Sequence, residues 1–158
     1  MTFPAALSRT PAIIGSFVAM MAIGASFGLV TPALGGTMLD MQMNAVDARA
    51  YLATLDPSQR HLHLFATLVQ DTAYPLAYGA FLGAIAARAF GNRFAWPAML
   101  AAASDLAENA AQSAALQGAE AALAAKTVLT PLKFGLFMLA ALLALAGLLT
   151  LLVRLLRR

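Results

Sequence analysis

The stretch FGLFMLAALLALAGLLTLLV, residues 134–153, decides the fold of this chain. Lys133 precedes it and Arg154 follows it, and no charged side chain lies between them. A helix of about 20 apolar residues is long enough to cross the hydrocarbon core of a bilayer. The stretch therefore predicts a transmembrane helix, which we place at residues 127–153.

The composition predicts that the rest of the chain is also in the membrane. The 158 residues are 61% hydrophobic and 11% charged, and their mean hydropathy is +0.78. A soluble domain of this size does not bury so much apolar surface. Three further stretches have the length of a span, at residues 12–34, 62–90 and 94–116. We therefore expect an all-α integral membrane four-helix bundle, forming a single transmembrane domain over residues 1–158.

The positions of the basic residues predict the orientation. Cytoplasmic loops of membrane proteins are enriched in Lys and Arg. Six arginines fall on one predicted side, so we expect both termini to be cytoplasmic. They flank the spans instead of forming a stripe with stacking aromatics, which argues against a nucleic-acid partner. These arginines are Arg9, Arg88, Arg93, Arg154, Arg157 and Arg158.

The substantial outer loop, residues 35–56, has its own helical pattern. Asn44 is a suitable N-cap for a short helix. We expect Val46, Leu52 and Leu55 to make the apolar contacts of this helix. The loop is therefore predicted to carry a helix near the membrane surface.

The second predicted span follows a clear helix-start signal. Asp56 is the expected N-cap, Pro57 occupies the first helical position, and Gln59 completes a capping box. Within this helix, Pro75 lacks the backbone N–H that would bond the carbonyl of Asp71. The pattern predicts either a carbonyl open to a ligand or water, or a simple kink.

Three acidic residues, Asp71, Asp105 and Glu108, lie inside predicted spans. An ionised carboxylate is costly in a bilayer, so such residues usually face a protein interior or a cavity and mark a ligand, ion or proton site. At about 100° per residue, other polar side chains share their helix faces. We expect the polar faces of the second and third helices to meet. A purely structural polar network is the alternative.

These faces supply the candidate site residues. If the protein is an enzyme, Asp71, Glu108 and Asp105 are the predicted catalytic residues, since a neutral and an ionised carboxyl can act as acid and base. Lys133 is either a site residue or a snorkelling interfacial anchor. The predicted ligand-binding residues are His63, Thr67, Gln70, Tyr74, Tyr78, Asn109, Gln112 and Lys133.

Metal and cofactor sites are not predicted. The chain has no cysteine. His61 and His63 are two residues apart, so on a helix they point to nearly opposite sides. The Glu-x-x-His pairs of di-metal bundles are absent from the sequence. We therefore expect neither a metal nor a cofactor.

Small residues in the first span predict close helix packing. Gly24 and Gly28 form a GxxxG motif, which allows two helices to approach closely. The partner is either a neighbouring helix of the same chain or a second copy, which would give a homodimer. Membrane lipid is the other expected partner.

The segments around Tyr51, Asp71 to Tyr78, and Asp105-Leu106-Ala107-Glu108-Asn109 carry a family likeness. Over residues 50–113 the chain resembles small four-span bacterial membrane proteins of uncharacterised function, which have an Asp-x-x-Glu-Asn element in the third helix. The resemblance implies a multi-pass protein of the bacterial inner membrane. It implies no activity.

Three functions fit these patterns. The first is binding or transport of a small or amphipathic ligand in an acidic intramembrane pocket, with possible linkage to protons. The second is a membrane-embedded enzyme that uses carboxylate acid/base chemistry on a lipid or isoprenoid substrate. The third is a scaffold subunit of a larger membrane complex. We expect the first function.

Overall fold

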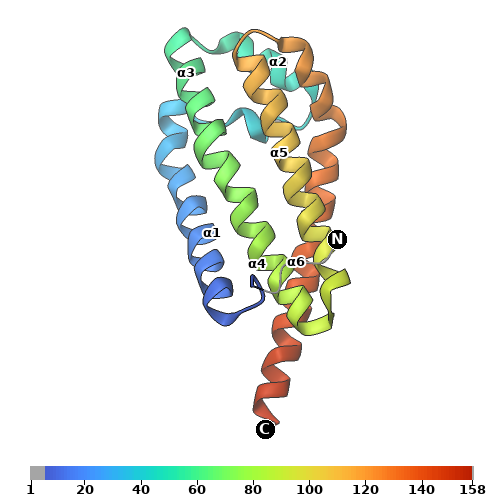
Figure 1. Cartoon of the computed structure of the whole chain (residues 1–158). Helices are drawn as coiled ribbons and strands as arrows, with labels where there is room; N and C mark the ends of the chain where they lie inside the picture. Colours follow the sequence, from blue (N-terminus) through green and yellow to red (C-terminus); the bar gives the residue numbers. More distant parts are fainter. Residues whose placement is uncertain (1–5, 158) are drawn as a thin grey trace.

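The computed structural model describes residues 6–157, which fold into helices joined by short turns (Figure 1). No strand occurs within this range, so the expected all-α class is confirmed. The predictions for Arg158 and for residues 1–5 of the predicted domain fall outside the described part. The long helices are α1 (Thr10–Val30), α4 (Thr72–Phe90), α5 (Trp96–Leu116) and α6 (Lys126–Leu156).

Shorter elements cover one end of the bundle. They are η1 (Thr31–Leu34), η2 (Leu39–Met41), α2 (Ala45–Thr54), α3 (Pro57–Ala66) and η5 (Glu120–Ala125). We call residues 31–56 the cap. At the other end, the short turn η4 (Asn92–Ala95) joins α4 to α5. Figure 1 shows that α1 begins and α6 ends at this second end.

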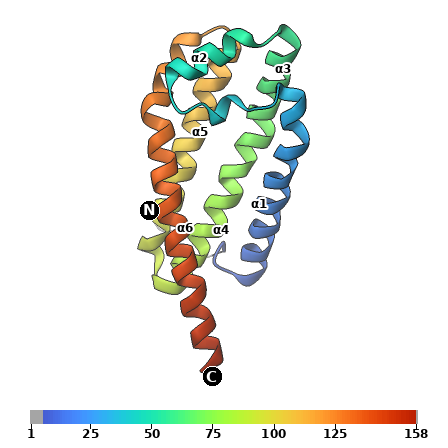
Figure 2. The ribbon, with the colours of Figure 1, turned by 180° about the vertical axis from the view of Figure 1, so that it is seen from behind.

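Helix α4 occupies the centre of the arrangement. It packs against α1, α5 and α6, and α5 also packs against α6. Figure 2 shows α1 and α6 on either side of α4, with the cap crossing above them. The end of α6 extends beyond the other helices (Figure 1).

Two helical segments, Thr10–Leu34 and Glu120–Leu156, are long and apolar enough to cross a membrane. Both present large apolar side chains on the outside of the structure. An exposed apolar surface of this extent is typical of a lipid or protein contact. On these two segments it includes Ile14, Phe17, Val18, Met21, Leu29, Met138, Leu139, Leu142, Leu145 and Leu149.

Glycines let α4 approach its neighbours closely. A Cβ on Gly79 would lie 3.0 Å from the Cβ of Ala102 on α5. A Cβ on Gly147 of α6 would lie 3.1 Å from side-chain atoms of both Ala89 and Ile85 on α4. Contacts of this kind allow close interhelical packing where side chains are small.

The predicted helix starts in the cap region are confirmed. Asn44 Oδ1 accepts hydrogen bonds from the backbone N–H groups of Val46 and Asp47, at 2.9 and 3.0 Å. Asp56 and Gln59 form the reciprocal capping box. The expected apolar role of Val46 is wrong, since this side chain is 73% exposed, whereas Leu52 and Leu55 are buried.

The second predicted span is not one regular α-helix. The π-helical turn η3 (Thr67–Asp71) separates α3 from α4. The hydroxyl of Thr72 donates to the carbonyl of Thr67 at 2.8 Å, five residues back. A π-turn inserts one residue into the helix. Residues before the turn are therefore rotated by about 100° relative to those after it.

Candidate functional site

A cavity of about 550 Å³ lies between α1, the cap, α4, α5 and α6. Its walls are mainly apolar and aromatic. Three acidic residues and one lysine provide the charged groups, and they come from four different elements. The lining residues are Gly24, Phe27, Thr31, Gly36, Thr37, Met38, Asp40, Met41, Asp71, Tyr74, Tyr78, Asp105, Lys133, Phe134 and Phe137.

Glu108 of α5 is the centre of a buried ion-pair network. Its side chain is fully buried and pairs with the fully buried Lys126 of α6. The hydroxyl of Thr130 donates to Glu108 Oε1 at 2.7 Å. Lys133 Nζ lies 3.0 Å from Glu108 Oε2. A buried carboxylate requires such partners, because its desolvation is otherwise uncompensated.

Lys133 joins this network to the cavity. Its Nζ lies 3.1 Å from Asp105 Oδ1, and it also pairs with Asp40. Helical spacing explains the geometry: Thr130 and Lys133 are three residues apart and therefore share one face of α6. Lys133 is only 4% exposed, so it is part of the site and not a snorkelling anchor.

The cap supplies Asp40, which sequence analysis did not identify. Gly35 and Gly36 have φ values of 90° and 91°, a left-handed conformation that turns the chain back over the bundle. Leu39, beside Asp40, is buried against Leu52 and Leu116 in an apolar cluster. Burial of this neighbour directs Asp40 toward α5 and α6.

Two side chains hold the turn that precedes Asp40. His63 Nε2 lies 3.0 Å from the carbonyl oxygen of Leu34. A carbonyl only accepts, so Nε2 carries the proton and donates. The Tyr51 hydroxyl lies 2.9 Å from the carbonyl oxygen of Thr37. Burial raises the pKa of Tyr51, so this hydroxyl stays protonated and can donate.

Asp71 has a different environment from the other acids. It ends the π-turn, is only 4% exposed, and lines the cavity. Its Oδ2 atom has no hydrogen-bond partner among residues 6–157. Its backbone carbonyl accepts a hydrogen bond from Asn109 Nδ2 at 2.8 Å. The Asp71 carbonyl, to which Pro75 cannot donate, is therefore hydrogen-bonded to a side chain of α5 and is not left for a ligand.

The acids outnumber the lysines in this region. Asp40, Asp105 and Glu108 share Lys126 and Lys133, and Asp71 has no ion-pair partner among the described residues. Two surplus negative charges remain if all six groups ionise. Such a surplus in a buried site favours binding of protons or of a cation.

The predicted meeting of the polar faces is correct only in part. The Tyr78 hydroxyl donates to Asp105 Oδ2 at 3.1 Å, which joins α4 to α5. Glu108, however, faces α6. Gln112 donates to Asp40 at 3.2 Å and so supports the cap instead of lining the cavity.

Five predicted ligand-binding residues do not line the cavity: His63, Thr67, Gln70, Asn109 and Gln112. His63 holds the cap, Gln70 donates to the hydroxyl of Ser26 at 2.6 Å, and Thr67 is buried in the π-turn. The π-turn explains the position of His63, because it rotates the preceding helix α3 away from the face that carries Tyr74 and Tyr78. A uniform 100° per residue is wrong across this segment.

Lys126 was also missed, because its position just before an apolar span suggested an exposed outer residue. A signal for it exists in the sequence. Lys126, Thr130 and Lys133 recur at helical spacing. This polar face is what the carboxylates of α5 require.

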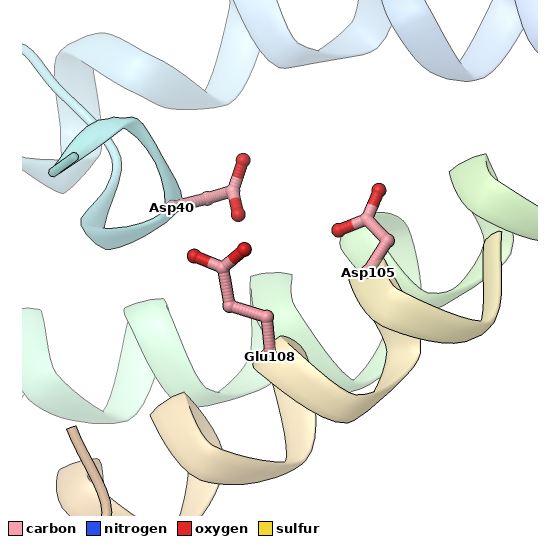
Figure 3. A group of neighbouring side chains, drawn as sticks. All are labelled: Asp40, Asp105 and Glu108. Carbon is pink, nitrogen blue, oxygen red and sulfur yellow. The ribbon is translucent and has the colours of Figure 1, made fainter. Parts of the chain in front are cut away.

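Asp40, Asp105 and Glu108 place carboxylate oxygens within 4.8 Å of one another. Figure 3 shows the three side chains converging, Asp40 from the cap and the other two from α5. Oxygen ligands of this type suit hard divalent cations. Here the ammonium group of Lys133 contacts all three carboxylates. A metal ion would have to displace it.

The GxxxG motif has two different surroundings. A Cβ on Gly24 would lie 3.4 Å from the ring of Tyr74, so Gly24 packs within the chain. A Cβ on Gly28 would meet no atom within 4 Å. Only Gly28 is therefore open to an external contact.

Comparison with known proteins gives no assignment. No protein-family model, curated protein or solved structure matches the chain. The site is therefore interpreted from its own geometry.

Proposed function

We propose that the chain is a four-span protein of the bacterial inner membrane that binds a small or amphipathic ligand in the cavity beside Asp71. One observation carries the proposal. Asp71 is buried, has an unpartnered carboxylate oxygen, and lines a cavity of about 550 Å³. Ligand sites are typically largely apolar cavities of about 300–1,000 Å³ with a few polar groups.

The arrangement of α4 and α5 supports four spans. Helix α5 has 21 residues, which at about 1.5 Å each is close to the thickness of the hydrocarbon core. Its mean hydropathy is lowered by polar residues that are turned inward. These buried residues are Asp105, Glu108, Asn109, Gln112 and Ser113.

The orientation follows the arginines. The start of α1 and the end of α6 lie at the arginine-rich end of the bundle (Figure 1). The positive-inside rule places this end in the cytoplasm. The chain contains no cysteine, so single cysteines report accessibility without background.

Topology is tested with Ala53→Cys in the cap and Asn92→Cys in the α4–α5 turn, both at exposed positions. We expect a membrane-impermeant maleimide to label only Ala53→Cys in intact cells with a permeabilised outer membrane. Labelling of both, or only of Asn92→Cys, would contradict the proposed orientation.

The function itself is tested by extracting the purified protein and identifying small molecules that copurify with it. We expect a bound amphipathic molecule in the wild type that is lost in a cavity-filling Gly24→Phe variant. A Gly15→Phe variant is the control, because a Cβ there meets no atom within 4 Å. Equal recovery from both variants would refute binding in the cavity.

Transport linked to protons is the expected use of the bound ligand, since the surplus acids can exchange protons for it. The hydrogen bond between Tyr78 and Asp105 at the cavity wall favours the enzyme as a second candidate. An enzyme predicts turnover that is lost in Asp105→Asn and Tyr78→Phe. The open cavity supports either of these over the scaffold alternative.

A homodimer through the GxxxG face stays a prediction. The open position at Gly28 supports a contact with a second copy, whereas Gly24 is occupied by Tyr74. Crosslinking through a Gly28→Cys variant tests it.

A further inference from the structure

We propose that the ligand of the cavity is a lipophilic ammonium ion, with its cationic head at Asp71 and its apolar tail against the aromatic wall. This inference rests on the proposed function and specifies its ligand class. It follows from the juxtaposition of an unpartnered buried carboxylate oxygen, the absence of a cation paired with Asp71 among the described residues, and a continuous run of aromatic rings.

The first step concerns charge. Lys126 and Lys133 are both committed to the acids of α5 and the cap. Asp71 lies in the same cavity wall as Asp105 without a cation of its own. A buried ionised carboxylate needs a compensating charge. A proton or a cationic ligand supplies it at this position, and the next two observations favour the ligand.

The second step concerns hydrogen bonding. Two donors near Asp71 are used elsewhere: Asn109 Nδ2 bonds the Asp71 backbone carbonyl, and the Tyr78 hydroxyl bonds Asp105. The unpartnered atoms Asp71 Oδ2 and Asn109 Oδ1 are both acceptors. Asp71 Oδ2 therefore receives no hydrogen bond from residues 6–157, and a protonated amine can donate one whereas a carboxylate cannot.

The third step concerns the aromatic wall. Phe27 packs edge-on against Tyr74, with ring centroids 5.5 Å apart. Tyr74 packs against Tyr78 at 5.5 Å, and Tyr78 against Phe137 at 5.0 Å. The rings form a continuous surface from α1 across α4 to α6. Aromatic faces attract organic cations and also accept an apolar tail.

The cavity already contains one contact of this kind. Lys133 Nζ lies 5.3 Å from the centroid of the Phe134 ring. Phe134 lines the same cavity as the run of four rings, so an aromatic ring of this cavity already lies beside an ammonium group. An inorganic cation is disfavoured at Asp71, because the surrounding aromatic carbons are not metal ligands.

The experiment uses the full chain in maltoside detergent and four probes with a main chain of ten carbons. They are protonated dimethyldecylamine, decyltrimethylammonium, decanol and decanoate. The thermal unfolding midpoint is measured against probe concentration, which reports binding to the folded state. We expect protonated dimethyldecylamine, which has both the charge and an N–H, to bind at least about tenfold more tightly than decanol. Decyltrimethylammonium, which has the charge but no N–H, should bind more tightly than decanol and less tightly than the amine, and decanoate should not bind.

Variants assign this selectivity to the site. Asp71→Asn is expected to remove the preference for ammonium over decanol. Phe137→Leu is expected to weaken the binding of decyltrimethylammonium by about 3- to 30-fold, because it removes one aromatic face. Asp47→Asn is the matched control on an exposed cap residue. It should leave unchanged both the preference for ammonium over decanol and the affinity for decyltrimethylammonium.

The outcomes separate the two proposals. Equal affinity for decanol and the ammonium probes in the wild type overturns the ammonium inference and leaves amphipathic binding intact. A preference that persists in Asp71→Asn overturns the assignment of the site. Failure of all four probes to stabilise the wild type overturns the proposed function together with the inference.

Discussion

Lys126 and Glu108 form an ion pair in which neither side chain is exposed. It links the first turn of α6 to the middle of α5, next to the carboxylates that Lys133 holds at the cavity. Removing one partner of such a pair leaves a buried charge without compensation. The pair therefore fixes how α6 sits against α5.

We predict that Lys126→Met and Glu108→Gln each lower the free energy of unfolding by about 3 kcal/mol. The double variant should lose less than the sum, because the two residues interact directly. The measurement is a denaturation series in detergent. Glu120→Gln is the control, because its pair with Arg60 is exposed and 3.9 Å long, so about 1 kcal/mol or less is expected. Additive single effects would contradict the coupling.

The bond from Asn109 to the backbone of Asp71 predicts a second result. Pro75 cannot donate to that carbonyl, so Asn109→Ala leaves it unpaired at a cost of about 1–3 kcal/mol. In a Pro75→Ala background a backbone N–H is restored at this position. We expect Asn109→Ala to lower the free energy of unfolding by less in this background. The measurement compares the unfolding of the wild type, the two single variants and the double variant. An equal cost in both backgrounds would refute this explanation.

The cap predicts a difference between two neighbouring histidines. His63 is buried and donates to the carbonyl of Leu34, whereas His61 is exposed. We expect His63→Leu to speed hydrogen exchange of amides in residues 35–42, because the turn that carries Asp40 loses an anchor. His61→Leu should leave these rates unchanged. Similar rates in both variants would show that His63 does not hold the cap.

The start of α3 predicts a pH effect. The backbone N–H of Gln59 and then the hydroxyl of Ser58 hold the pKa of Asp56 below its ordinary value of 3.8. The stability contributed by this cap is therefore present above pH 3.8 and is lost as the pH falls through the lowered folded pKa. Asn also caps helices but does not titrate.

The measurement compares the thermal midpoint of the wild type with that of Asp56→Asn between neutral and acidic pH. We expect the two proteins to diverge only below about pH 4, with the wild type losing more stability. A constant difference across the range would mean that titration of Asp56 does not contribute.

Local signals explain what was predicted correctly. Asn44, Asp56 and Gln59 act on backbone groups within three residues, so their roles are visible in the sequence. The burial of the acids on α5 was predictable for a similar reason, because polar positions shared one face of a helix.

The parts of the site that were missed depend on distant segments. Asp40 reaches α6 because the chain turns at two glycines and buries Leu39, and this arrangement has no periodic pattern. Lys126 is buried because η5 packs against α5 and the start of α6 then lies beside Glu108. The π-turn was not visible either, since a single extra residue leaves the composition of the helix unchanged.

The π-turn has a consequence for how this chain accepts deletions. Removing one residue from the segment Thr67–Asp71 would convert it to a regular α-helix without shortening any apolar span below the bilayer thickness. Helix α3 would then rotate by about 100° relative to α4, which would move His63 away from the Leu34 carbonyl and change the direction of Asp71. The number of residues between Thr67 and Asp71 therefore determines how α3 is oriented, whereas a loop of the same length would tolerate the deletion.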